Sequence, residues 1–186
     1  RVIPMGVDLA FFYTKTEKIL LKNIPVKLIS IGRLIELKGF EYAIKSVNLI
    51  IKKGYNVQYK IVGAGEEKDK LLQLISKLKL TNNVFLVGAK NQKEIKNLLQ
   101  ERHIFLMSSI TDSKGRAEAQ GVVTVEAQAM GLPVVAYRSG VVPFTLLVNE
   151  TGFLINEKDI VSYANAIIEL IENNSLFGTM SIAART

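Results

Sequence analysis

The chain has 186 residues, of which 48% are hydrophobic and 22% charged, and this is the composition of an ordinary globular domain. It has no cysteine and one histidine, His103, which excludes disulfides, cysteine-based zinc sites and multi-histidine metal sites and disfavours a histidine-centred triad. The formal net charge of +7 favours an anionic partner, whether nucleic acid, a phosphorylated metabolite or an acidic membrane surface.

The first residues of the chain carry no targeting signal. Residues 1–6 lack the charged and apolar zones of a signal peptide, and no apolar run reaches the roughly 18 residues that a membrane span requires. We therefore expect a cytoplasmic protein. Residues 1–23 show no clear periodicity, so we expect the chain to begin within a connection rather than at a natural start.

From residue 26 onward, short apolar strands alternate with amphipathic helices. The β-rich run 26–32 precedes residues 39–53, whose apolar side chains recur at helical spacing. Strands of this kind need cover on both faces, which favours parallel pairing. We predict an α/β fold, with a Rossmann-like doubly wound parallel sheet of about six strands. The other strand and helix pairs are 58–62 with 68–78, 84–87 with 92–101, 104–107 with 121–130, 133–136 with 143–148, and 153–155 with 160–173.

The end of the chain has helical character without a stop signal. Residues 176–186 contain neither the proline nor the terminal glycine that commonly follows a helix. We expect an interrupted helix, and therefore a piece of a longer protein.

In a doubly wound sheet, ligands bind outside the carboxyl ends of the strands. The first connection at this edge, Gly32–Gly39, places Arg33 and Lys38 directly after a strand and before a helix, which suits an anion. A turn with two exposed basic residues is the alternative that the spacing leaves open. The second connection, residues 63–65, reads Gly-Ala-Gly and lacks the third glycine of a dinucleotide fingerprint.

The fourth connection, Ser108–Gln120, is long and polar, and such loops in compact domains are usually functional or mobile. Gly121 follows and opens an apolar helix, where a ligand can approach backbone N–H groups whose dipoles favour phosphate. Glu126 lies within this helix, where an unpaired carboxylate is costly. Glu126 either has a partner or faces solvent, and the spacing leaves both open.

Several segments match one family pattern in order and together cover nearly the whole chain. They are Pro4–Asp8 with Phe11 or Phe12, Gly32-Arg33-Leu34 with Lys38-Gly39, Val62–Gly65, Glu118-x7-Glu126 with Ala127–Ala136, and Gly152-Phe153-Leu154. This set resembles the donor-binding half of retaining GT-B glycosyltransferases of glycosyltransferase family 4, the group 1 enzymes. The ordered set is far more specific than any one of its segments.

The resemblance implies the C-terminal half of a GT-B fold. Residues 1–24 would be the interdomain linker and lead-in segment, residues 25–175 the nucleotide-sugar-binding domain, and residues 176–186 the start of a truncated helix. An N-terminal domain that this sequence lacks would hold the acceptor. The implied reaction transfers a hexose, with retention, from a UDP- or GDP-linked sugar to a glycan or lipid-linked acceptor, without metal or cofactor. Such enzymes make bacterial cell-surface polysaccharide or glycolipid in the cytoplasm, some of them peripheral at the inner face of the membrane.

The matched motifs also imply catalytic and donor-binding roles. Arg33 and Lys38 would bind the diphosphate, where preorganised cations favour the transition state as charge builds on the leaving group. Glu118 would lie near the donor sugar, and Glu126 would accept hydrogen bonds from both ribose hydroxyls. The remaining donor-binding residues would be Gly32, the helix-start residues Gly121, Val122 and Val123, and, near the base, Gly88, Ala89 and Lys90.

Two residues depart from the family pattern. The family commonly reads Ser-Gly-Gly-Ile-Pro-Glu after the fifth strand, whereas Val141 replaces a glycine in this chain and Phe144 replaces the carboxylate. Both changes bear on the finer geometry around the donor. For His103, at the start of a predicted buried strand, we expect a structural role.

Three alternatives differ from this interpretation. An NAD-dependent oxidoreductase needs a fuller glycine fingerprint and an acidic residue at the end of the second strand, whereas this chain has Gly63-Ala64-Gly65 after that strand. A nucleic-acid-binding module predicts aromatic residues interleaved with a basic patch, but the aromatic residues are mostly core-spaced, so we expect no nucleic acid partner. A non-catalytic relative that keeps the donor pocket is left open by Val141 and Phe144.

Overall fold

The computed structural model describes residues 7–185, so the predicted motif residues Pro4, Met5 and Gly6 lie outside the described part. A six-stranded sheet with the order β3-β2-β1-β4-β5-β6 forms its centre, and every neighbouring pair of strands is parallel. The predicted doubly wound α/β fold is therefore confirmed. The strands are β1 (Val26–Ile31), β2 (Val57–Val62), β3 (Val84–Leu86), β4 (Ile104–Met107), β5 (Val134–Tyr137) and β6 (Gly152–Ile155).

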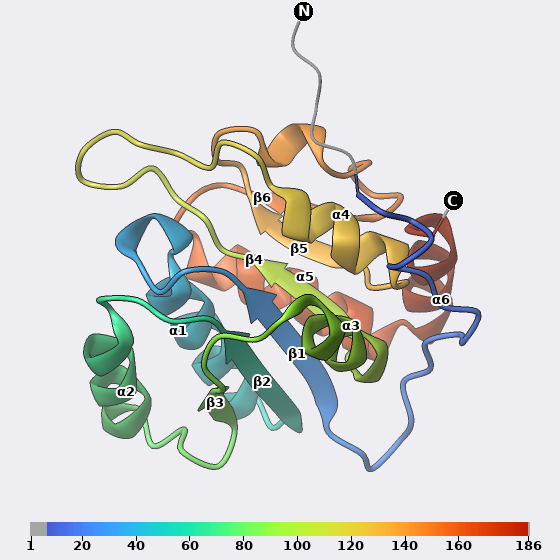
Figure 1. Ribbon diagram of the computed structural model, residues 1–186. Helices are drawn as coiled ribbons and strands as arrows, with labels where there is room; N and C mark the ends of the chain where they lie inside the picture. Colours follow the sequence, from blue (N-terminus) through green and yellow to red (C-terminus); the bar gives the residue numbers. More distant parts are fainter. Residues whose placement is uncertain (1–6, 186) are drawn as a thin grey trace, which may run out of the picture.

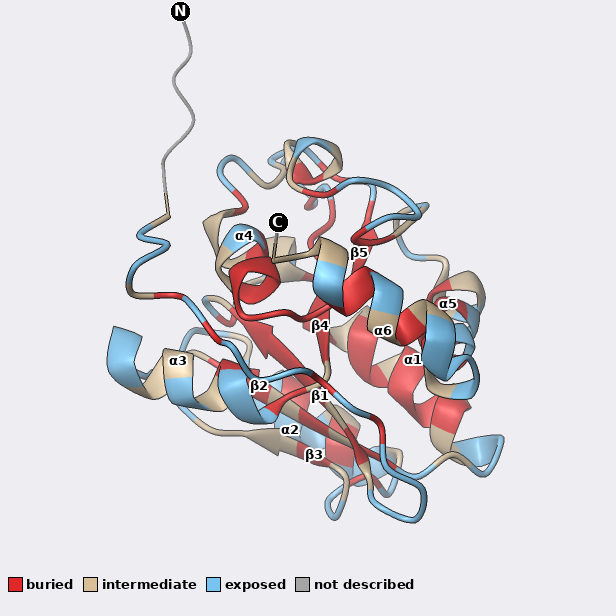
Figure 2. Cartoon of the chain, turned by 90° about the vertical axis from the view of Figure 1, so that its right-hand side faces the viewer, coloured by how far each residue is buried: buried red, intermediate tan, exposed pale blue. Residues whose placement is uncertain are grey.

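Helices cover both faces of the sheet (Figure 1). α3 and α4 lie on one face, and α1 and α5 lie on the other. This cover explains why all residues of β4 and β5 are buried, as Figure 2 shows in red. The helices are α1 (Phe40–Lys52), α2 (Lys68–Lys77), α3 (Gln92–Glu101), α4 (Val122–Ala129), α5 (Ile160–Glu172) and α6 (Asn174–Ala183).

The segment before β1 packs against the domain. Phe12 is 3% exposed and belongs to the core between the sheet and the α3–α4 face. The buried Lys18 donates hydrogen bonds from Nζ to the carbonyl oxygens of Leu99 and Gln100, at 2.9 and 2.5 Å, where α3 ends. Because unpaired carbonyls at a helix end favour a cation, Lys18 ties this segment to α3.

His103 connects β1 and β4 at the amino ends of the strands. Its Nδ1 accepts a hydrogen bond from the backbone N–H of Lys27 at 3.0 Å. Burial, together with the charges of Lys18, Lys27 and Arg102, lowers the pKa of His103 to about 4. The structural role predicted for His103 is confirmed, because a neutral ring is what this contact needs.

We expect the free energy of unfolding to fall by about 2 kcal/mol between pH 7 and pH 4.5 because of His103 alone. The unfolded histidine takes up a proton near pH 6.5, whereas the folded one resists until about pH 4. The stability that the neutral ring provides is therefore lost as the pH falls through this window. His103→Asn is the control, because its Oδ1 can accept the same N–H but cannot titrate. Urea unfolding of both proteins at the two pH values measures the effect, and identical losses in both would contradict it.

Two predicted elements differ in the structure. The predicted helix 143–148 is wrong, since only a 3₁₀ turn at Val142–Phe144 forms. The Oγ1 atoms of Thr145 and Thr151 bind nearby backbone groups, at Val142 and Leu147 respectively, and such bonds compete with helical ones. The C-terminal helix begins at Asn174 rather than at residue 176, because the side chain of Asn173 caps it.

Candidate functional site

The predicted site lies where the strand order reverses. β1 is flanked by β2 and β4, and the connections that leave β1 and β4 run to helices on opposite faces of the sheet, α1 and α4. The β1–α1 connection contains a 3₁₀ turn, Glu36–Lys38, and the β4–α4 connection runs from residue 108 to residue 121. Both leave the same edge of the sheet (Figure 1).

The two connections are joined by direct contacts. Ser108 Oγ donates to the carbonyl oxygen of Lys38 at 2.8 Å, and the N–H of Ile110 donates to that of Leu37 at 2.8 Å. Gly39 has φ 59°, and a Cβ there would lie 2.1 Å from the Ser108 carbonyl oxygen. Only glycine permits this approach, so Lys38 is held firmly beside the β4–α4 connection.

Lys38 and Glu118 form an ion pair across the site. Nζ of Lys38 lies 2.5 Å from Oε2 of Glu118, and the two side chains are 16% and 10% exposed. Ser109 Oγ donates to the same carboxylate oxygen at 3.0 Å. The aliphatic stem of Lys38 lies against Gly32, where a Cβ would come within 3.2 Å of its Cε. The pair therefore has a fixed position at the switch point.

The pKa of Glu118 reflects these contacts. Burial alone raises it, but the hydrogen bond and charge of Lys38, the Ser109 hydroxyl and the Gly121 backbone N–H together hold it below the ordinary range. Glu118 is thus a carboxylate in the structure, with Lys38 as its main counter-charge.

The start of α4 faces the same region: the Gly121 N–H donates to Glu118, and the N-cap glycine has no side chain to cap the helix. Gly121 is the N-cap with φ 62°, and a Cβ there would lie 2.8 Å from the Thr145 methyl group. The first turn of α4 contains no acidic residue. The N–H groups of Val122 and Val123 lack helical partners because they belong to the first turn, and their dipoles favour an anion.

Glu126 lies one turn further along α4 and is half-buried. Within residues 7–185 its carboxylate has no hydrogen bond or ion pair, and burial raises its pKa. A half-buried carboxylate without a partner is costly, and a ligand with hydroxyl groups would satisfy it.

Other predicted donor residues line a separate hollow at the ends of β1, β2 and β3. A cavity of about 320 Å³ is lined by Gly32, Arg33, Ala89 and Lys90, among others. Lys90 pairs with Glu94 at 3.0 Å. Gly88, with φ 74°, lies in open space, so the backbone of this turn is accessible.

The structure thus brings Lys38, Glu118 and the start of α4 into one site, and it places Arg33 and the turn at residues 88–90 around the neighbouring cavity. Sequence reasoning missed Ser108 and Ser109, which hold Lys38 and Glu118. The signal was available, since two serines directly follow an apolar strand at the predicted ligand edge.

The segment that departs from the family pattern packs against Glu118. Val141 has φ −83° and needs no glycine, and its N–H donates to the Glu118 carbonyl oxygen at 3.0 Å. Gly140 has φ 52°, and a Cβ there would lie 2.1 Å from that same oxygen. Val141 is therefore compatible with the site, while Phe144 is 89% exposed beyond it.

We expect Gly140→Ala and Val141→Gly to have unequal effects. The alanine would adopt a left-handed conformation and clash with the backbone of Glu118, which should cost about 2 kcal/mol of folding free energy or more. Val141→Gly should cost less than about 1 kcal/mol, because it keeps the contact and adds only backbone entropy. Urea unfolding measures both, and equal losses would contradict the packing of Gly140 on Glu118.

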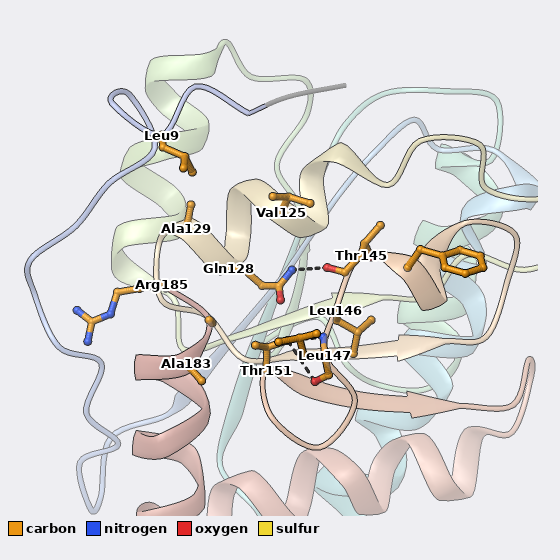
Figure 3. Close-up of a pocket in the computed structure, with 12 residues that line it drawn as sticks. Leu9, Val125, Gln128, Ala129, Thr145, Leu146, Leu147, Thr151, Ala183 and Arg185 are labelled. Atoms are coloured by element: carbon orange, nitrogen blue, oxygen red, sulfur yellow. Dashed lines mark hydrogen bonds between the residues drawn. The ribbon is translucent and has the colours of Figure 1, made fainter. Parts of the chain in front are cut away.

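A second cavity, of about 350 Å³, lies on another side of α4 (Figure 3). Its lining is mainly apolar and includes Leu9, Val125 and Leu147. Gln128 Nε2 donates to the carbonyl oxygen of Thr145 at 2.6 Å, so its amide is already engaged. None of the predicted site residues lines this cavity, and we assign it no chemistry.

Across residues 7–185, the helices are too short or too polar to cross a membrane.

A family model described as glycosyl transferases group 1 matches residues 13–186. The chain belongs to the group 1 glycosyltransferases. The resemblance to this group is confirmed, and the alternative of an NAD-binding domain receives no support. The amylovoran biosynthesis glycosyltransferase AmsK of Erwinia amylovora is 33% identical over 185 residues, which are 100% of this chain and 45% of AmsK. The group 1 domain therefore spans less than half the length of that relative.

Two solved structures have the same architecture. A variant of S. aureus TarM in complex with fondaparinux, α-GlcNAc-glycerol and UDP has a TM-score of 0.76 at 27% identity, covering 93% of this chain and 34% of that chain. The C-terminal domain of LpcC from Francisella tularensis has a TM-score of 0.79 at 22% identity, covering 97% of this chain and 95% of that one. The second likeness shows the fold alone, and its crystal contained a C-terminal domain by itself.

Proposed function

We propose that this chain is the donor-binding, C-terminal half of a retaining glycosyltransferase of family 4. It would transfer a hexose from a UDP- or GDP-linked sugar to a glycan or lipid-linked acceptor in bacterial cell-surface polysaccharide or glycolipid synthesis. Membership of group 1, the name of AmsK and the UDP bound to the TarM variant support this proposal. An N-terminal half would hold the acceptor, and the enzyme would work in the cytoplasm or at the inner membrane face.

The observation that carries the proposal is the meeting of Lys38, Glu118 and the uncapped start of α4 at the switch point. A cation and free N–H dipoles suit a diphosphate, and a carboxylate in the same place suits the hydroxyl groups of a sugar. A nucleotide sugar is the ligand that presents both groups side by side.

Each site residue takes a role in this proposal. Lys38 and Arg33 bind the diphosphate and stabilise the charge that builds as it leaves, together with the N–H groups of Gly121, Val122 and Val123. Glu118 binds the sugar, and the partnerless Glu126 accepts the ribose hydroxyls. The base lies by the open turn formed by Gly88, Ala89 and Lys90. Gly32 contacts the aliphatic stem of Lys38 and leaves room for it.

For the transfer step we propose front-face attack with retention of the anomeric configuration. The acceptor oxygen forms the new bond to the anomeric carbon as the bond to the phosphate oxygen breaks, and the departing phosphate takes the acceptor proton. In this proposal Glu118 binds the sugar hydroxyls and Glu126 binds the ribose, so neither is assigned the role of a covalent nucleophile. Lys38 and Arg33 supply the positive charge for the leaving group, and no metal or cofactor is part of the proposal.

We expect the chain by itself to fold, to bind a nucleoside diphosphate weakly and to transfer no sugar. The crystal of the LpcC C-terminal domain supports folding without the other half. Transfer should fail because the half that would hold the acceptor is missing. Calorimetric titration with UDP, GDP and ADP, followed by the corresponding glucose or mannose donors, measures the affinities and shows which base the chain prefers. Detectable transfer to an acceptor by the isolated chain would contradict this division of roles.

A further inference from the structure

Lys38 and Glu118 bind each other in the structure, although the proposed function directs them to different parts of the donor. We propose that Glu118 competes with the donor diphosphate for Lys38, so that the site binds a nucleoside diphosphate without a sugar more weakly than the corresponding nucleotide sugar. This inference rests on the proposed function and names a specificity that it does not contain. Glu118 would give up Lys38 when a nucleotide sugar binds, and the sugar hydroxyls would replace the lost contact.

The geometry sets the two interactions against each other. Nζ of Lys38 lies 2.5 Å from the carboxylate, which Ser109 also holds at 3.0 Å. A phosphate oxygen bound to the same ammonium would lie within about 5 Å of the carboxylate, where two negative charges repel each other. Gly39 packs the Lys38 connection against Ser108, and Gly140 packs against the backbone of Glu118, so the backbone at both residues is held in place.

Because Lys38 and Glu118 are largely shielded from water, separating them costs binding free energy. The side chains of Lys38 and Glu118 are 16% and 10% exposed, so water screens their attraction only in part. When a diphosphate without sugar binds, Glu118 loses Lys38 and gains nothing. A nucleotide sugar offers hydroxyl donors to the released carboxylate, and the loss is offset. After transfer, Glu118 returns to Lys38 and favours release of the spent nucleotide.

The decisive variants are Glu118→Gln and Ser109→Ala in the full-length protein. Calorimetry with UDP, GDP and ADP first finds the nucleotide that the native protein prefers. Glu118→Gln removes the competing charge and should bind that nucleotide about 10-fold more tightly. Ser109→Ala keeps the carboxylate but removes its second anchor, and it should bind about threefold more tightly, the scale of one neutral hydrogen bond.

Glu126→Gln is the matched control. Its carboxylate lies on α4 without a partner, so its loss should weaken binding of the same nucleotide rather than strengthen it. Thermal unfolding adds a second measurement. Without nucleotide, Glu118→Gln should have a lower Tm than the native protein, since Lys38 is left unpaired. Added nucleotide should reduce this difference in Tm.

The outcomes separate the two proposals. If the native protein binds a nucleotide but both Glu118→Gln and Ser109→Ala bind it equally or more weakly, the competition is wrong while the donor site stands. If the native protein binds none of the three nucleotides and none of the corresponding nucleotide sugars, the proposed function itself fails. Ser109→Ala decides the question even if Glu118→Gln does not fold, because a buried serine-to-alanine change removes no charge.

Discussion

Lys38→Ala in the full-length protein is expected to lower turnover by roughly 10²- to 10³-fold, the scale for losing one preorganised transition-state donor. Negative charge builds on the diphosphate as its bond to the sugar breaks. The ammonium of Lys38 lies at the proposed diphosphate position, and its stem is fixed against Gly32. The variant should still fold, because Glu118 keeps its contacts with Ser109 and the Gly121 amide. Steady-state kinetics with saturating donor measure the effect.

Lys45→Ala is the control for this prediction. Lys45 is a partly exposed cation on α1 that pairs with Glu41 at 3.2 Å, away from the strand ends that form the site. Its loss should leave turnover within about twofold of the native value, since exposed pairs contribute little. If Lys38→Ala also leaves turnover unchanged, Lys38 has no part in catalysis and its pair with Glu118 is structural.

The second large effect separates the two glutamates. Glu126 contacts the ribose equally in the ground and transition states in our proposal, so Glu126→Gln should raise KM for the donor about 10-fold and leave kcat nearly unchanged. Glu118 faces the reacting sugar, so Glu118→Gln should lower kcat by about 10-fold or more. Initial-rate kinetics over a range of donor concentrations distinguish the two patterns.

A 2′-deoxyribose donor supplies the control for Glu126. The native protein should bind the deoxy donor more weakly than the ribose donor, because one hydroxyl contact is missing. Glu126→Gln should show a much smaller difference between the two donors. Equal penalties in both proteins would mean that Glu126 does not contact the ribose and only faces solvent.

The alternation of apolar strands with amphipathic helices was sufficient to predict the parallel sheet, since each strand needs cover on both faces. It also placed the ligand edge, because the carboxyl ends of parallel strands meet there. The short run at residues 143–148 misled, because the hydroxyls of Thr145 and Thr151 bind backbone groups that a helix would use. Helical spacing over so few residues is weak support when such side chains are present.

The contacts within the site could not be predicted from spacing. Lys38 and Glu118 are 80 residues apart in sequence, and only the close approach at Gly39 brings their connections together. Resemblance identified both residues but assigned them separately, one to the phosphate and one to the sugar. The pairing of Lys38 with Glu118, and the two serines that hold these residues, can be read only from the packed structure.

A crystal structure of the chain with a bound nucleoside diphosphate tests the central proposal most directly. We predict that the diphosphate lies at the switch point, with its oxygens about 3 Å from Lys38 Nζ and from the N–H groups that open α4, and with the ribose against Glu126. A nucleotide bound elsewhere, such as in the apolar cavity of Figure 3, would contradict the assignment of this site.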